Sequence, residues 1–153
     1  MEQKSLTALI SAFSRAYHAL NNEVTIFNDS LARDLLTDEE FNQIAKNMSN
    51  GIGFFNPSFV GEPEQALRWV VDNQLSPSPL GRAAFAEKSL EWAVRTGTEQ
   101  YLIWGAGYDT FAYRQPLWAK ALQIFEVDHP ATARDKHERL NSAGIENPDS
   151  VHY

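Results

Sequence analysis

A short apolar run that is followed at once by two glycines constrains the fold of this chain more than any other feature. The run is Tyr101-Leu102-Ile103-Trp104, and Gly105-Ala106-Gly107 comes directly after it. An apolar run without polar alternation is typical of a strand in a parallel sheet that is buried on both faces. Glycines at its end let the backbone turn tightly and approach a ligand where a Cβ atom would collide. The pattern therefore predicts an α/β fold.

A second strand is predicted over residues 122–127, and it ends at Asp128, 21 residues beyond Gly107. A carboxylate at this distance, at the tip of the second strand, can accept hydrogen bonds from ribose hydroxyls. The pattern therefore indicates a nucleotide-binding βαβ unit. The alternative is an ordinary turn, with Asp128 capping the helix that opens at Pro130.

A dinucleotide fits this turn less well than a smaller adenosine-containing ligand. A dinucleotide-binding turn has a third glycine three residues after the second, where this chain has Thr110. A ligand that contains adenosine but no pyrophosphate fits better. S-adenosyl-L-methionine is the commonest cofactor of that kind.

The first part of the chain is predicted to be helical. Ser5 can cap a first helix, Thr37 and Glu40 have the spacing of a capping box, and Pro63 suits a first helical turn. A short helix is expected after Asp29 or Ser30. A loop is expected over 51–61 and a further helix over about 80–95.

Strand and turn patterns replace the helical spacing near residue 97. We therefore predict two regions, an N-terminal helical cap or lid over 1–96 and the start of a Rossmann-like domain over 97–153. In the second region a polar helix is expected from Pro130. Its mixed charges at 134–139 are predicted to be a solvated face.

Two strands, with a third beginning at Val151, are fewer than the roughly five to seven of a doubly wound sheet. We therefore expect the sheet to be incomplete, either because the chain is the N-terminal part of a longer protein or because another chain completes it. An uncovered edge is predicted beside Ile124, Phe125 and Val127, where a second copy could pair. The chain alone is then expected to form homo-oligomers or to aggregate, and to be weakly active or inactive.

Composition excludes several functions. Thirteen Lys and Arg against twenty Asp and Glu give a net charge of −7, and there is no local basic patch, so nucleic acid is not an expected partner. No apolar run approaches the roughly 18 residues of a membrane span. The chain has no cysteine, and its four histidines lack metal-ligand spacing, so no metal site is predicted. The polar N-terminus does not resemble a signal peptide, which makes the cytoplasm the default compartment.

Several segments together resemble the leucine carboxyl methyltransferase family, a group of class I S-adenosylmethionine-dependent methyltransferases that includes bacterial polyketide carboxyl methyltransferases. Residues 102–114 resemble the family's GAGxDT…R segment, and residues 125–130 resemble its EVDxP motif. Segments 14–18 and 27–32 are similar to its N-terminal signature, and segment 81–87 to its arginine motif. The resemblance spans essentially the whole chain.

The resemblance implies how the cofactor would be held. Arg82 would pair with the methionine carboxylate, which suits a guanidinium fork. Gly105 and Gly107 would let the loop pass close to the amino-acid and ribose portions, and Asp128 would hold the ribose hydroxyls. A surface arginine is the alternative for Arg82.

A helical lid is also implied, in which Arg15 and Tyr17 would fold over the cofactor. The alternative places Tyr17 on the apolar stripe of its helix and Arg15 in solvent. Both interpretations fit the helical spacing of this segment.

The implied reaction is methyl transfer to the carboxylate of a small molecule. A carboxylate is already ionised at neutral pH, so no general base is required and no catalytic residue is assigned. Complete family members are longer, and their adenine-contact and substrate residues lie beyond position 153. Two other functions remain open: a truncated, non-catalytic binding or assembly module, and half of a dinucleotide-binding oxidoreductase.

Overall fold

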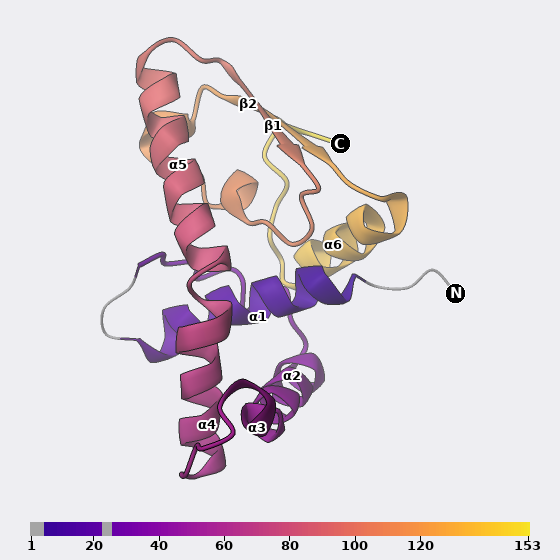
Figure 1. Ribbon diagram of the computed structural model, residues 1–153. Coiled ribbons are helices and arrows are strands. Elements are labelled where there is room, and N and C mark those ends of the chain that lie inside the picture. The colour runs from indigo at the N-terminus through magenta and orange to yellow at the C-terminus, as the bar shows by residue number, and fades with distance from the viewer. Residues whose placement is uncertain (1–4, 23–25) are drawn as a thin grey trace.

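The computed structural model describes residues 5–22 and 26–153 and shows a small parallel sheet with helices on one side of it (Figure 1). The strands are β1 (Gln100–Trp104), β2 (Gln123–Val127) and β3 (Val151–His152). The α-helices are α1 (Leu6–Asn21), α2 (Asp38–Asn50), α3 (Ile52–Phe55), α4 (Pro63–Val70), α5 (Pro79–Arg95) and α6 (Pro130–Ser142). A π-helical segment, η1 (Val71–Leu75), follows α4, and two 3-10 turns, η2 (Phe111–Tyr113) and η3 (Leu117–Ala119), lie between β1 and β2.

Local signals in the sequence set the ends of several helices, as predicted. The Ser5 hydroxyl caps α1 by accepting a hydrogen bond of 3.3 Å from the N–H of Ala8. Thr37 and Glu40 form the expected capping box at the start of α2, with both hydrogen bonds at 3.1 Å. Pro63 is the first residue of α4. Each signal acts within one helical turn, which is why it can be recognised without knowledge of the tertiary structure.

Two local predictions were wrong. Turns, not a helix, follow Asp29, whose carboxylate accepts a hydrogen bond of 3.1 Å from the N–H of Ala32. The segment predicted as a loop over 51–61 begins with the four-residue helix α3. Gly51 ends α2 and also precedes α3, so the glycine stops one helix without producing an extended loop.

The sheet is parallel throughout and has the order β1-β2-β3, which confirms the predicted Rossmann-like α/β class. Val151 pairs with Ile124, and His152 with Phe125, so β2 is the central strand. The prediction of an uncovered edge is therefore wrong at Ile124 and Phe125, whereas Val127 has no partner in β3. Within 5–22 and 26–153, the outer edges of the sheet belong to β1 and β3.

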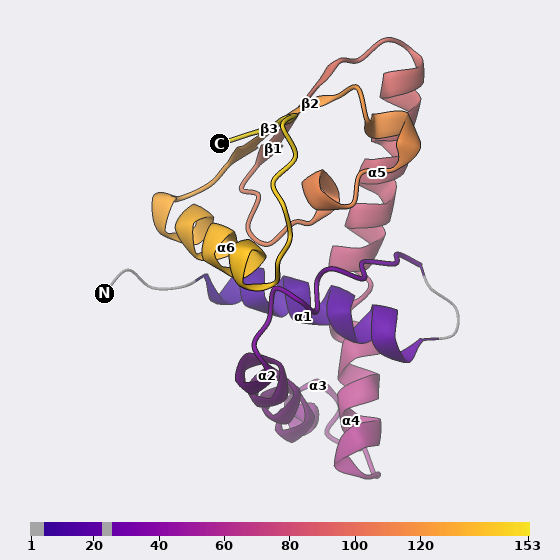
Figure 2. The same ribbon diagram turned by 180° about the vertical axis from the view of Figure 1, so that it is seen from behind.

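The two faces of the sheet differ in burial. Ile124 and Val151 pack with Leu90 of α5 and Phe111 of η2 in a buried apolar cluster. On the opposite face Leu102 is 55% exposed and Trp104 is 80% exposed. The prediction that β1 is buried on both faces is wrong, because the helices of the described residues lie on one side only (Figure 2).

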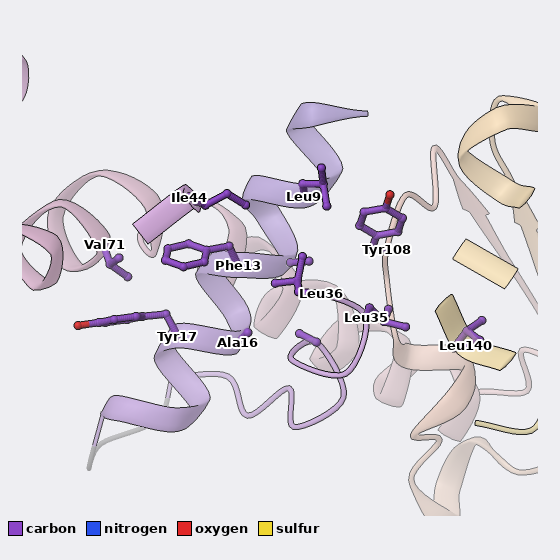
Figure 3. Close-up of a cluster of buried hydrophobic side chains, with 12 residues drawn as sticks. Leu9, Phe13, Ala16, Tyr17, Leu35, Leu36, Ile44, Val71, Tyr108 and Leu140 are labelled. Carbon is purple, nitrogen blue, oxygen red and sulfur yellow. The ribbon is translucent and has the colours of Figure 1, made fainter. Parts of the chain in front are cut away.

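A second apolar cluster joins the helices to the loop after β1 (Figure 3). Phe13 and Tyr17 of α1 pack in it, and Tyr108, just beyond the glycine turn, reaches the same cluster. Tyr17 is 8% exposed, so the alternative that it lies on the apolar stripe of α1 is confirmed. Through Tyr108 the glycine turn is anchored in the helical core.

Helix α6 buries charges that were predicted to be solvated. Lys136 is 2% exposed, and its ammonium lies 2.8 and 2.7 Å from the two carboxylate oxygens of Glu126 on β2. Arg139 forms hydrogen bonds of 2.6 and 2.7 Å to the carboxylate of Glu40 on α2. These hydrogen bonds place the two cations of α6 against carboxylates of β2 and α2. The Arg139–Glu40 pair links the two predicted regions, whose boundary near residue 96 stays a prediction.

Among the residues that the structure describes, no helix is long and apolar enough to cross a membrane. Nor do any three of their histidine, aspartate and glutamate side chains gather as a group that could hold a metal ion.

Candidate functional site

A cavity of about 700 Å³ lies between α1, the N-terminal half of α5 and the turn after β1. All four residues predicted to hold a ligand line it, although they come from three separate places in the sequence. Gly105 and Gly107 come from the turn after β1, Asp128 follows β2, and Arg82 lies near the start of α5. The structure therefore brings together the residues that the sequence singled out, while their roles in binding stay predictions.

The glycine turn has a backbone conformation that other residues rarely adopt. Gly105 has a φ of +74° and Gly107 a φ of +52°, a region where a Cβ atom crowds the backbone. A Cβ added to Gly107 would lie 3.3 Å from the Cβ of Ala8 on α1. Glycine at 107 thus permits both the turn and the close approach of α1.

Asp128 holds this turn in place. Its Oδ2 accepts a hydrogen bond of 2.6 Å from the N–H of Gly107, and its Oδ1 accepts one of 2.6 Å from the N–H of His129. The alternative that Asp128 caps α6 is wrong, because the cap is His129, whose ring accepts a hydrogen bond from the N–H of Ala131. A carboxylate has about four acceptor positions, so Asp128 keeps acceptor capacity for ligand hydroxyls.

Arg82 is both a surface residue and a residue of the ligand cavity. Its side chain is exposed near the first turn of α5, as a surface arginine would be, and it also lines the cavity. Within the described part of the chain its guanidinium has no hydrogen bond or ion pair. A guanidinium without a protein partner is available to a carboxylate of a ligand.

Arg15 is buried and paired, so the alternative that it is solvated is wrong. It is 5% exposed and lines the cavity. Its Nη2 donates a hydrogen bond of 2.7 Å to the carbonyl of Tyr108, and its Nη1 lies 3.3 Å from Oδ2 of the fully buried Asp29. Because it fixes the backbone one residue after Gly107, Arg15 supports the glycine turn from the side of α1.

A second arginine, which is partly buried and which the sequence did not indicate as a site residue, supports the same segment. Arg114 forms a two-pronged ion pair with Glu87 of α5 and donates a hydrogen bond of 2.9 Å to the Thr110 hydroxyl. Thr110 in turn donates one of 2.7 Å to Asp29. Burial raises the pKa of the Glu87 carboxyl, although Arg114 acts in the opposite direction. The spacing of Thr110 and Arg114, four residues apart in the GAGxDT…R segment, is the signal that could have revealed this network.

The sheet is parallel, a glycine turn follows its first strand and a carboxylate follows its second, and both lie at one cavity. This arrangement is typical of Rossmann-like nucleotide-binding proteins. The chain belongs to the leucine carboxyl methyltransferase family, whose sequence model matches residues 8–153. This confirms the resemblance found in the sequence motifs.

Individual relatives agree with this assignment. The chain is 46% identical over 155 residues to a protein of Bacillus subtilis named "Putative S-adenosyl-L-methionine-dependent methyltransferase YktD"; the match covers 99% of this chain and 51% of the relative. It is 29% identical over 140 residues to a "Putative S-adenosyl-L-methionine-dependent methyltransferase" of Mycobacterium bovis, covering 92% of this chain and 37% of that protein. The chain thus spans about half the length of the Bacillus relative, and less of the mycobacterial one.

Proposed function

We propose that the protein is an S-adenosylmethionine-dependent methyltransferase that binds its cofactor in the cavity between α1, α5 and the glycine turn. The observation that carries the proposal is the convergence of Arg82, Gly105, Gly107 and Asp128 on that single cavity. The family and the names of the relatives support it.

The residues present fit this cofactor. Asp128 has acceptor capacity for the ribose hydroxyls, and the two glycines keep side chains out of the turn that the ligand approaches. Arg82 offers the methionine carboxylate a guanidinium that has no hydrogen bond or ion pair with any residue in 5–22 or 26–153. When bound, the cofactor supplies an electrophilic methyl group on a sulfonium.

For the acceptor we propose a carboxylate of a small molecule. Such a group is already ionised at neutral pH, so the protein must position it in line with the methyl group without removing a proton. The two carboxylates lining the cavity support this, because both are used to hold the backbone. Asp109 accepts a hydrogen bond of 2.8 Å from the N–H of Phe111, and Asp128 accepts one from Gly107.

Calorimetric titration with S-adenosylhomocysteine and with NAD tests the cofactor assignment. We expect binding of S-adenosylhomocysteine only. Binding of NAD alone would favour the dinucleotide-binding oxidoreductase, and binding of neither would favour the non-catalytic module. The acceptor is tested by methyl transfer from labelled cofactor to a panel of small carboxylic acids, with the methyl esters of the same acids as controls.

For assembly we propose that a second copy pairs along the outer edge of β1. The exposed Leu102 and Trp104 lie on this strand, and no described residue pairs with its outer edge. Unpaired backbone groups beside exposed apolar side chains favour association of strands. Light scattering on the purified protein should show a dimer or larger species, and a monomer at high concentration would contradict this.

A further inference from the structure

Ser14 of α1 presents a buried polar group to the cavity without a partner. It lines the cavity and is 0% exposed. Its hydroxyl makes no hydrogen bond with any residue in 5–22 or 26–153. A serine in a helix often bonds back to the carbonyl four residues earlier, and this one does not. A buried hydroxyl without a partner is unfavourable, so a ligand that supplies the missing hydrogen bond would be favoured at this point.

The position of Ser14 along α1 indicates which part of a ligand it faces. Ala8, on the same helix, lies so close to Gly107 that a Cβ added there would be 3.3 Å from the Ala8 Cβ, and so it marks the end of the cavity where Asp128 lies. Ser14 is six residues further on, about 9 Å along the helix axis. In that direction α1 passes across α5, which carries Arg82 (Figure 1). Ser14 therefore lies toward the Arg82 end of the cavity, away from the ribose end.

We propose that the Ser14 hydroxyl binds the carboxylate of the cofactor's amino-acid portion, together with Arg82. This inference rests on the proposed function, because it assumes that the cavity holds S-adenosylmethionine. A hydroxyl donates to a carboxylate in a charge-assisted hydrogen bond, and the cation of Arg82 selects the negative carboxylate over the ammonium group of the same ligand. The neighbouring Arg15 already contacts the Tyr108 carbonyl and the Asp29 carboxylate, so its guanidinium is not available to the carboxylate of the ligand.

The chain offers a matched control for Ser14. Ser76 is 4% exposed, and its hydroxyl also has no hydrogen-bond partner within the described residues. Ser76 does not line the cavity. Ser14→Ala and Ser76→Ala therefore remove the same kind of group, one inside the cavity and one outside it.

The experiment titrates three ligands into the unmodified protein and both variants by calorimetry. S-adenosylhomocysteine has the whole amino-acid portion, the decarboxylated thioether analogue lacks only its carboxylate, and 5′-methylthioadenosine lacks the amino-acid portion. We expect S14A to weaken S-adenosylhomocysteine binding by about fivefold or more and to leave the affinity for the other two ligands unchanged. S76A should alter none of the three affinities.

The outcomes separate this inference from the proposed function. Failure of the unmodified protein to bind S-adenosylhomocysteine would overturn the proposed function. If S14A binds S-adenosylhomocysteine as tightly as the unmodified protein does, the inference alone is overturned. The same holds if S14A loses affinity equally for all three ligands. Thermal unfolding without ligand should show S14A at least as stable as the unmodified protein. If it is less stable, Ser14→Cys, which keeps the volume with a weaker donor, must show the same selective loss.

Discussion

The backbone N–H of Gly107 donates a hydrogen bond of 2.6 Å to the carboxylate of Asp128 and so ties the glycine turn to the end of β2. The residue proposed to hold the ribose therefore also holds the loop that the ligand approaches. A site built in this way needs little rearrangement on binding, since the donor and acceptor groups are already placed.

Asp128→Ala should weaken binding of S-adenosylmethionine at least about tenfold. The substitution removes two charge-assisted hydrogen bonds to the ribose, worth about 1.5–3 kcal/mol each at most, and releases the N–H of Gly107. Asp128→Asn, which keeps an acceptor for Gly107, should lose less. Calorimetry measures the affinity, with Asp34→Ala at an exposed carboxylate as the control. An unchanged affinity in a folded Asp128→Ala protein would show that Asp128 does not hold the ribose hydroxyls.

Gly107→Val should abolish cofactor binding with less damage to folding than to affinity. A β-branched residue opposes the φ of +52°, and its Cβ would crowd Ala8 at 3.3 Å and displace α1 from the cavity. The comparison of Gly107→Ala with Gly144→Ala isolates this contact, since Gly144 has a φ of +68° and open space around it. Backbone strain alone should cost each alanine variant about 1–2 kcal/mol. Normal binding by Gly107→Val would make the loop an ordinary turn.

How far the sequence predicted the structure depended on the range of the interactions. The caps at Ser5 and Thr37 were predictable because they involve neighbours within one turn. Burial of Lys136 was not, because its partner Glu126 lies on β2 and only the packing of α6 brings the two together. The orphaned hydroxyl of Ser14 has no sequence signal either, since a serine on a helix is ordinarily solvated or bonded to the backbone.

Asp29→Ala should destabilise the protein by about 3–5 kcal/mol, because it leaves the buried cation of Arg15 without its carboxylate partner. It also removes one of the two carboxylates that surround Arg114, which keeps its ion pair with Glu87. Urea denaturation measures the free energy of unfolding. The control is Glu91→Ala, which breaks the exposed pair with Arg95 and should cost about 1 kcal/mol or less. Equal effects of the two substitutions would show that Asp29 has no special structural role.

The buried pair of Lys136 and Glu126 should show strong coupling in a double-mutant cycle. Burial raises the pKa of Glu126 although the Lys136 charge opposes this, so the ionised carboxylate depends on its partner. Lys136→Met alone should cost about 3–5 kcal/mol, while Glu126→Gln combined with Lys136→Met should cost much less. Glutamine is chosen for Glu126 because its amide oxygen can still accept the hydrogen bond from the Tyr113 hydroxyl. Additive effects in urea denaturation would contradict the coupling.

His137 should make stability fall on mild acidification. Burial, and after it the charge of Lys136, lowers the pKa of His137 below its ordinary 6.5, and its ring lies edge-on to Tyr153. The unfolded chain therefore binds more protons than the folded protein between the lowered pKa and 6.5. The free energy of unfolding must then decrease as the pH falls through that window.

Replacing His137 by glutamine removes this contribution, which is less than about 1 kcal/mol because the ring is partly exposed to solvent. Urea denaturation of both proteins at several pH values from neutral into the acidic range measures the difference directly. The loss on acidification should be smaller for His137→Gln, and parallel stability profiles would show that His137 is titrated alike in the folded and unfolded states.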